Sequence, residues 1–510
     1  MRAVEVILLL VVLATTVAAS ARRLRLPAPS LLVLAGLLVA LIPGVPTIEV
    51  APDVVGLVVL PPLLYAAGQD LPWQELRPVW RPVTVLALGL VMASAAAVTM
   101  VASAVTPLPL SMAFVLGAVL ASTDPVAVTA LGRRLPLPAR LRALIQAESL
   151  FNDATSLVLF RVAVAAAVAG GGLSLGRGVA QFVLLSGGGA AIGAVLAGAV
   201  ALIRRRTEDP VLETVIALAT PYICYVAAEQ VRVSGITAVV VASVILAGKQ
   251  PRLSSAPIRL QVHAVYDTVV FLLESVVFSL IGLQLPSLVR AVGTHHWGWL
   301  LQAAALTGTL LAVRALWVFP LWLAVSHRAR TRPSWTVPAV ISWAGARGVL
   351  PLAAALSIPL TAGDGPGSPS RTLVLLLTTA VIVTTLIVQG FTLGPLVRRA
   401  GVAVPPLHSQ TEEGTAADAM TRAAMRYLDE VENLDAAPAA LVTQLRQMLL
   451  ARLDGAHADP DEPTLRGLRR DVIAVEAAEL THLYEHGVIG AETRRRLQRR
   501  LDLEETSLRD

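Results

Sequence analysis

Residues 144–160 read LIQAESLFNDATSLVLF, a run in which two carboxylates and an amide stand among mostly apolar neighbours. A charged side chain inside a bilayer is costly unless it is paired, protonated or bound to a cation, so such residues are functional by default. On a helix, Ser149 and Asp153 share one face because they are four residues apart. Glu148 and Asn152 share the neighbouring face for the same reason. The stretch therefore predicts two functional surfaces on a single membrane-spanning helix.

The rest of the chain has the composition of a polytopic membrane protein. Of its 510 residues, 55% are hydrophobic and only 15% are charged, and the mean hydropathy is +0.70. These values argue against a soluble globular protein. Apolar runs near the roughly 20 residues of a membrane-spanning helix recur from residue 3 to about residue 396. From Pro405 onwards Glu, Asp, Arg and Ala dominate, so we predict a transmembrane domain over residues 1–400 and a cytoplasmic helical domain over residues 406–510.

Arginine and lysine are concentrated in alternate connections between the apolar runs, for example RRLPLPARLR at 133–142, RRRTED at 204–209 and SHRARTR at 326–332. Because short cytoplasmic loops carry the excess of these residues, we predict a multi-pass protein of the cell membrane with its N-terminus outside and its tail in the cytoplasm. Thirteen candidate spans follow, at 3–20, 28–43, 51–69, 82–105, 109–132, 141–169, 177–203, 209–230, 235–248, 264–285, 297–325, 335–360 and 371–396.

The number of spans predicts two inverted six-helix repeats. If one helix separates two groups of six, the second group starts from the opposite side of the membrane, which is a common transporter plan. Span 5 then corresponds to span 12, and both are interrupted, by STDPVA at 122–127 and by WAGARGVLP at 343–351. Proline and glycine leave backbone groups there without helical partners, which is tolerated only where the backbone is buried in protein or lines a wet cavity. The two breaks therefore predict a substrate site, with two ordinary helix kinks as the alternative.

The polar groups of these segments suggest an ion pair and a separate cation site. Glu148 requires a partner, and Arg347 in the second break is the candidate, because arginine binds carboxylates through two parallel hydrogen bonds. Asp153 has no evident basic partner. Hydroxyls, backbone carbonyls of the first break, Asn152 and Asp124 would surround it with oxygen, the ligand type of small hard cations. The single available carboxylate favours a monovalent over a divalent ion.

A carboxylate that binds either a proton or a cation predicts exchange. If only one of them can occupy Asp153 while the site alternates between the two faces of the membrane, transport of one requires the return of the other. With Glu148 neutralised by Arg347, one proton traded for one monovalent cation moves no net charge.

Four segments resemble one family of transporters. They are ASTDPVAVTALGRRLPLPARLRALIQAESLFNDATSLVLF at 121–160, SGITAVVVASVILAG at 234–248, FLLESVVFSLIGLQLP at 271–286 and SWAGARGVLPLAAAL at 342–356. They are similar to the cation:proton antiporter family that contains bacterial Na⁺/H⁺ antiporters and animal sodium/proton exchangers. The resemblance covers residues 1 to about 400, and the joint presence of TDP, ESLFND and ARG is specific to that family.

The resemblance implies roles for individual residues. Asp153 would carry the ion and the proton, and Asn152 would complete the Asn-Asp pair associated with electroneutral members. Thr123 and Asp124 match the broken-helix motif, in which the threonine main-chain carbonyl helps to coordinate the ion. Ser149 matches a coordinating hydroxyl.

The resemblance also implies that Glu148 and Arg347 form the core ion pair, that the two broken helices cross, and that the protein is a homodimer. One half-domain would form the dimer interface and the other would move the site. The chain departs from many relatives in LPPLLYAAGQDL at 60–71, where Ala66 replaces a glutamate near the ion site. This leaves the choice between Na⁺, Li⁺ and K⁺ open. Glu274 fits either a structural hydrogen bond or a role in access to the site.

The sequence predicts electroneutral exchange of Na⁺ for H⁺ across the cytoplasmic membrane, in support of pH homeostasis. A K⁺-preferring antiporter is the alternative within transport. A cation channel could use the same carboxylate without coupling, and an intramembrane aspartyl hydrolase would need Asp124 and Asp153 as its dyad. A single cysteine, Cys224, and the lack of an HExxH motif argue against disulfide, multi-cysteine and zinc-protease sites, so no cofactor is predicted. Basic residues in loops suit membrane topology better than a nucleic-acid partner.

The tail shows helical periodicity and no recognisable catalytic or nucleotide-binding motif. A small helical domain that packs on itself, on a dimer mate or on the membrane is one interpretation. Sensing of pH or of a partner is the other, supported only by the i,i+4 spacing of His482 and His486.

Overall fold

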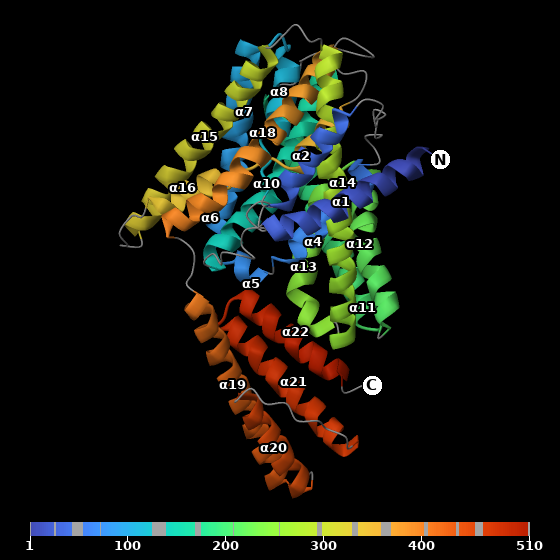
Figure 1. Ribbon diagram of the computed structural model, residues 1–510, viewed down its shortest axis with the longest axis vertical. Helices are drawn as coiled ribbons and strands as arrows, with labels where there is room; N and C mark the ends of the chain where they lie inside the picture. Colours follow the sequence, from blue (N-terminus) through green and yellow to red (C-terminus); the bar gives the residue numbers. More distant parts are fainter. Residues whose placement is uncertain are drawn as a thin grey trace. The chain divides into compact units, whose positions relative to one another are not determined.

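The computed structural model describes most of the chain, and every regular element in that part is a helix (Figure 1). The predicted all-α membrane class is therefore confirmed. The described residues are 2–24, 27–42, 55–71, 73–124, 139–168, 175–207, 209–253, 255–292, 298–328, 335–358, 369–401, 406–434, 438–453 and 463–507.

Apart from the short α5, the helices as far as residue 400 fall on the predicted spans. The third predicted span contains η1 and α4, and the fourth is continuous through α6, η2 and α7, where η1 and η2 are wider π-helical turns. The bounds are α1 Arg2–Leu24, α2 Ala28–Ala40, η1 Val55–Val59, α4 Leu60–Gln69, α5 Trp73–Leu76, α6 Trp80–Thr84, η2 Val85–Leu90, α7 Val91–Val105, α8 Leu110–Leu120, α10 Ala139–Val168, α11 Leu175–Arg204, α12 Pro210–Gln230, α13 Gly235–Leu253, α14 Ala256–Val292, α15 Gly298–Arg328, α16 Thr336–Trp343, α17 Val349–Leu356 and α18 Pro369–Ala400.

Seven helical segments in the described part are long and apolar enough to cross a membrane. Shorter apolar helices, including α2 and α8, accompany them. The count of thirteen spans and their relation by inverted repeats stay predictions. The seven segments are Trp80–Val105, Leu141–Val168, Gly176–Arg204, Pro210–Gln230, Ile258–Val292, Gly298–Ala324 and Pro369–Ala400.

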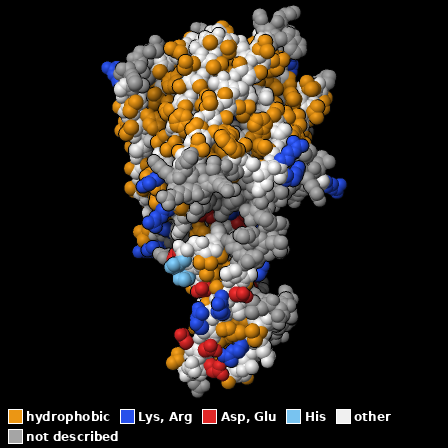
Figure 2. Space-filling model, turned by 90° about the vertical axis from the view of Figure 1, so that its left-hand side faces the viewer, with side chains coloured by type: hydrophobic (Ala, Val, Ile, Leu, Met, Phe, Trp, Pro, Cys, Tyr) orange, Lys and Arg blue, Asp and Glu red, His pale blue; other side chains and the backbone are white. Residues whose placement is uncertain are grey.

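The long helices differ in how much of their apolar surface the protein itself covers. The most apolar window of α18 is 83% buried, whereas that of α15 is 22% buried, so α18 is an interior helix and α15 a peripheral one. Large exposed apolar side chains are frequent on α11, α12 and α15, for example Val183, Leu184, Val195, Leu301 and Leu316. A broad hydrophobic surface with few charges is visible over the helices that precede the tail (Figure 2). Such a surface suits the hydrocarbon of a bilayer.

The interior is centred on α8, which packs against α7, α10 and α18. Met112, Leu116 and Leu120 of α8 are fully buried. Gly117 permits the approach of α7, because a Cβ at this position would lie 2.4 Å from the carbonyl oxygen of Ala95. Small residues at such contacts allow membrane helices to pack closely.

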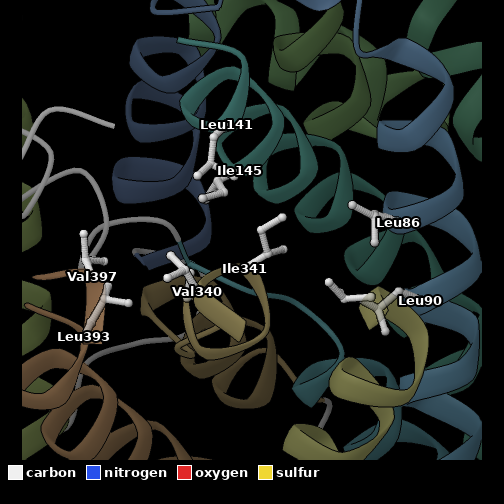
Figure 3. Close-up of a cluster of buried hydrophobic side chains, with 10 residues drawn as sticks. Leu86, Leu90, Leu141, Ile145, Val340, Ile341, Leu393 and Val397 are labelled. Atoms are coloured by element: carbon white, nitrogen blue, oxygen red, sulfur yellow. The ribbon is translucent and has the colours of Figure 1, made fainter. Parts of the chain in front are cut away.

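A hydrophobic cluster fixes the start of α10 against η2, α15, α16 and α18 (Figure 3). Its α10 members are Leu141 and Ile145, and the second of them lies one turn before Glu148. The cluster therefore holds the polar stretch of α10 in a defined position relative to α16, the first half of the second interrupted span. The other buried members are Leu86, Leu90, Val318, Val340, Ile341, Ala344, Leu393 and Val397.

The two predicted interruptions are present and they touch each other. Residues 121–124 follow α8 without helical structure, and residues 344–348 separate α16 from α17. The backbone N–H of Asp124 donates to the carbonyl oxygen of Ala346 at 2.8 Å. Residues 125–127 of the first break lie outside the described residues.

A second compact unit comprises Arg204–Thr214, Arg252–Val265 and Val404–Asp510. Its tail helices pair as α19 with α21, α21 with α22 and α19 with α20, around two hydrophobic clusters. Leu480, Leu483 and Leu501 belong to one cluster, and Leu428 and Val442 to the other. The helix bounds are α19 Pro406–Asn433, α20 Ala439–Leu453, α21 Pro463–Glu485 and α22 Ala491–Ser507.

Candidate functional site

The polar stretch of α10 is buried inside the helix bundle. Glu148, Ser149 and Asn152 are at most 2% exposed, and Asp153 is 6% exposed. Their positions on one helix agree with the two predicted faces. Buried polar groups need partners, and the first interrupted span supplies most of them.

The face that carries Asp153 lies against the first break. The hydroxyl of Ser122 donates to Oδ1 of Asp153 at 2.5 Å. Ser149, one turn earlier on α10, donates to the carbonyl oxygen of Thr123 at 2.5 Å. This is the carbonyl to which the family resemblance gives a role in ion coordination, and its donor Ser149 lies on the same face of α10 as Asp153. Ser122 was missed as a contact of Asp153, although it stands directly before the TDP motif.

The neighbouring face of α10 also contacts the first break. The amide of Asn152 donates to Oγ1 of Thr123 at 3.0 Å, and that hydroxyl donates to Oε1 of Glu148 at 3.2 Å. The amide oxygen of Asn152 is buried and has no hydrogen-bond partner among the described residues. A buried amide oxygen without a donor can accept a cation, because hard cations bind oxygen ligands.

The predicted pair of Glu148 with Arg347 is wrong in its partner. Arg314 of α15 donates from both Nη atoms to the two oxygens of Glu148, each at 2.7 Å, and both side chains are buried. Its Nε donates to the carbonyl oxygen of Ile341 at 3.1 Å. The pair therefore ties α10 to α15 and α16. Geometry decides the partner, since either arginine could form the same bidentate bond.

Arg314 could have been found in the sequence. It stands in the apolar run LTGTLLAVRALWVFP at 306–320, and a charge at the centre of such a run is functional by default. The ARG motif, which contains Arg347 and not Arg314, favoured the other arginine.

Arg347 lies in the second break and is 2% exposed. Its Nη1 donates to the carbonyl oxygen of Gly345 at 2.7 Å, and its backbone N–H donates to Oγ1 of Thr385 at 3.2 Å. The side chain of Asp124 packs against the next residue, because a Cβ on Gly348 would lie 1.5 Å from Oδ2 of Asp124. The predicted residues Asp124 and Arg347 are thus brought to the contact between the two breaks.

Two further predicted positions lie on other helices. Ala66 is half-buried on α4, which packs against α10. Glu274 is half-buried on α14. Their roles in ion choice and in access stay predictions.

The whole membrane part of the chain, and not only the motifs of the site, matches a known family. The family model described as "Sodium/hydrogen exchanger, transmembrane" matches residues 8–399. The chain belongs to this family. Because the family and the relatives named below are exchangers and antiporters, the chain is a multi-pass membrane transporter and not an enzyme, so the aspartyl hydrolase alternative is excluded.

Similar proteins include named antiporters. An uncharacterized Na⁺/H⁺ exchanger of Mycobacterium tuberculosis is 33% identical over 96% of this chain and 93% of its own length. A "sodium, potassium, lithium and rubidium/H⁺ antiporter" of Bacillus subtilis is 34% identical over 71% of this chain and 56% of its own length. The sodium proton antiporter MjNhaP1 of Methanocaldococcus jannaschii shares the fold, with a TM-score of 0.65 and 20% identity over 78% of this chain and 99% of that chain.

Proposed function

We propose that this exchanger moves one monovalent cation, with Na⁺ as the first candidate, against one proton, and that both bind in turn to Asp153. The proposal rests on the different surroundings of the two carboxylates on α10. Glu148 is already neutralised by Arg314, whereas Asp153 accepts a hydrogen bond from the neutral hydroxyl of Ser122. A buried carboxylate in that position needs a proton or a cation.

The candidate cation ligands are oxygens of α10 and of the first break. They are the hydroxyl of Ser149, the main-chain carbonyl of Thr123 and the amide oxygen of Asn152, with the carboxylate of Asp124 in the same break. Because Ser149 donates to the Thr123 carbonyl in this structure, a bound cation would have to turn that hydroxyl away. An oxygen shell with one available carboxylate suits a monovalent ion.

Equal charge in the two loaded forms supports electroneutral exchange. The Glu148–Arg314 pair adds no net charge. Asp153 binds one positive charge in either loaded form, a proton or a monovalent cation. One complete cycle therefore transfers no net charge across the membrane. Exchange of this kind across the cell membrane would serve pH homeostasis.

The choice of cation has a second candidate. The Bacillus subtilis relative is named for sodium, potassium, lithium and rubidium, which supports a broad range of monovalent cations for this chain. Ala66 stands where many relatives carry a glutamate near the site. Without that carboxylate the electric field at the cation is weaker, which would favour the larger K⁺ more than a site with the glutamate would. K⁺ is therefore the alternative to Na⁺.

The predicted assembly belongs to the same proposal. A homodimer in the cell membrane, with the N-terminus outside and the tail in the cytoplasm, fits the distribution of arginine in the connections. The exposed apolar faces of α11 and α12 leave surface for lipid and for a second copy.

Cation-driven dissipation of a pH gradient in proteoliposomes tests the proposal. Addition of Na⁺, Li⁺ or K⁺ to the parent should release the gradient, and the ion with the lowest half-saturating concentration is the physiological candidate. Asp153→Asn should abolish the flux. The matched control Asp267→Asn, at an exposed position on α14, should retain it.

Three outcomes contradict the proposal. Flux that persists in Asp153→Asn would mean that another group carries the ions. Flux in the parent that depends strongly on an imposed voltage would exclude one-for-one exchange. Current without a counter-gradient would identify a channel.

A further inference from the structure

Arg347 carries a buried guanidinium whose role the site described above does not explain. The carboxylate that the sequence assigned to it is taken by Arg314, which occupies both oxygens of Glu148. In the structure, Arg347 donates to a backbone carbonyl of its own loop, at Gly345. Its Nε is buried without a hydrogen-bond partner in the described part of the chain.

Such a position is costly. Arginine stays protonated in proteins, so Arg347 brings a full charge into the bundle. A buried charge without a counter-charge is unfavourable, and a neutral carbonyl compensates it only in part. A partner of opposite charge is therefore expected in at least one state of the transport cycle.

Contacts lead from Arg347 past Asp124 to Asp153, and Asp153 is the carboxylate whose charge changes in the proposed cycle. The residues on either side of Arg347 touch Asp124, one through the Ala346 carbonyl and the other through the close approach at Gly348. Ser122, two residues before Asp124, donates to Asp153. Arg347 also lies within electrostatic range of Asp153.

We propose that Arg347 is the internal counter-charge of the empty site: when Asp153 holds neither proton nor cation, the guanidinium pairs with its carboxylate, and an arriving cation displaces it. This inference rests on the proposed role of Asp153. In this proposal Arg347 competes with the transported cation for Asp153, while Arg314 remains paired with Glu148.

Competition by an internal charge has a definite consequence for transport. The guanidinium both occupies the carboxylate and repels the incoming cation, so it lowers the affinity for the cargo. It also gives the unloaded form a neutral, stabilised resting pair. Loss of the charge should therefore tighten cation binding while the maximal rate falls or stays the same.

Two substitutions of Arg347 separate charge from structure. Exchange is measured in proteoliposomes at one alkaline pH, with Na⁺ varied against choline. In Arg347→Gln the half-saturating Na⁺ concentration should fall about tenfold. This is the order of the effect expected when one unit charge near a binding site inside a protein is removed. Arg347→Lys keeps the charge and should stay near the parent value.

The matched control is Arg161→Gln. Arg161 lies on α10 as well, but it pairs with Glu229 at the end of α12, away from the breaks. Its substitution should leave half-saturation unchanged. An unchanged value in Arg347→Gln, or equal shifts in Arg347→Gln and Arg347→Lys, would overturn the inference.

A stability cycle covers the case in which Arg347→Gln folds poorly. In choline buffer, the melting-temperature losses of Asp153→Asn and Arg347→Gln should be non-additive, because both remove the same attraction. If Arg347→Gln alone does not fold, addition of Asp153→Asn should restore folded protein. Additive losses, or a double variant that is not recovered, would overturn the inference.

The same experiments distinguish the two proposals. If Asp153→Asn still exchanges ions, the proposed function fails. If Asp153 is required but the half-saturating Na⁺ concentration is indifferent to the charge at position 347, only the counter-charge role fails.

Discussion

At the scale of single residues, Glu148 and Arg314 form the ion pair around which the site is assembled. Both hydrogen bonds measure 2.7 Å, and the side chains are 1% and 3% exposed. A third bond from Arg314 reaches Ile341. A buried pair adds little net stability over a packed apolar pair, but loss of one member leaves the other charge uncompensated.

Glu148→Gln should therefore lower the free energy of unfolding by roughly 3–5 kcal/mol. The measurement is denaturant or thermal unfolding of the purified protein in detergent. Glu229→Gln is the matched control, because Glu229 pairs with Arg161 while both side chains remain about one third exposed, at 32% and 29%. That change should cost at most about 1 kcal/mol. Equal losses in the two variants would show that burial does not set the energy of the Glu148 pair.

The sequence located these residues better than it paired them. Glu148, Asn152 and Asp153 stand out because polar groups are rare in apolar runs. The partner of Glu148 depends on which helix crosses α10 at that height. Arg314 is 166 residues away along the chain, and no local pattern shows which of the two arginines lies beside Glu148.

At the scale of elements, the two interrupted helices were predictable because proline and glycine mark them in the sequence. Their contact was not a matter of sequence pattern. It depends on backbone atoms, through the bond from Asp124 to Ala346, and on the lack of a side chain at Gly348. The breaks therefore act as one unit in which α8 and α17 share a boundary.

Gly348→Ala tests this contact. The added methyl group would lie 1.5 Å from Oδ2 of Asp124, so the two breaks must separate. We expect the exchange rate to fall by about tenfold or more, because small displacements of binding groups are costly for function. Gly308→Ala on α15 is the control, since nothing lies within 4 Å of a Cβ at that position. The same rate in both variants would show that the close contact is dispensable.

At the scale of the whole molecule, composition alone separates an apolar part from a charged tail, and periodicity predicts the tail helices. The second unit also recruits two connections from the first 300 residues, which composition does not reveal. One contains the buried pair of Arg204 with Glu213 at 2.6 Å. The other contains Arg259 at the start of α14, whose partner Asp502 is 243 residues away. Contacts of such separation require the folded chain.

The Arg259–Asp502 pair predicts how firmly α22 is held within the second unit. Nε of Arg259 donates to Oδ2 of Asp502 at 3.0 Å, Nη2 donates to Oδ1, and the Asp502 side chain is 5% exposed. Asp502→Asn weakens both bonds and leaves the arginine without its counter-charge, so α22 should open more often. Chymotryptic cleavage in the tail of the full-length protein should accelerate by about tenfold, since cleavage follows the open population.

Two variants complete this test of the tail. Asp418→Asn, at an exposed position on α19, should be cleaved at the parental rate. The exchange of both charges, Arg259→Asp with Asp502→Arg, should return cleavage towards the parental rate, because the attraction is restored with opposite polarity. If Asp502→Asn is cleaved no faster than Asp418→Asn, the hydrophobic clusters hold α22 without the ion pair. If only the double variant is cleaved rapidly, the pair depends on its local geometry more than on its charge.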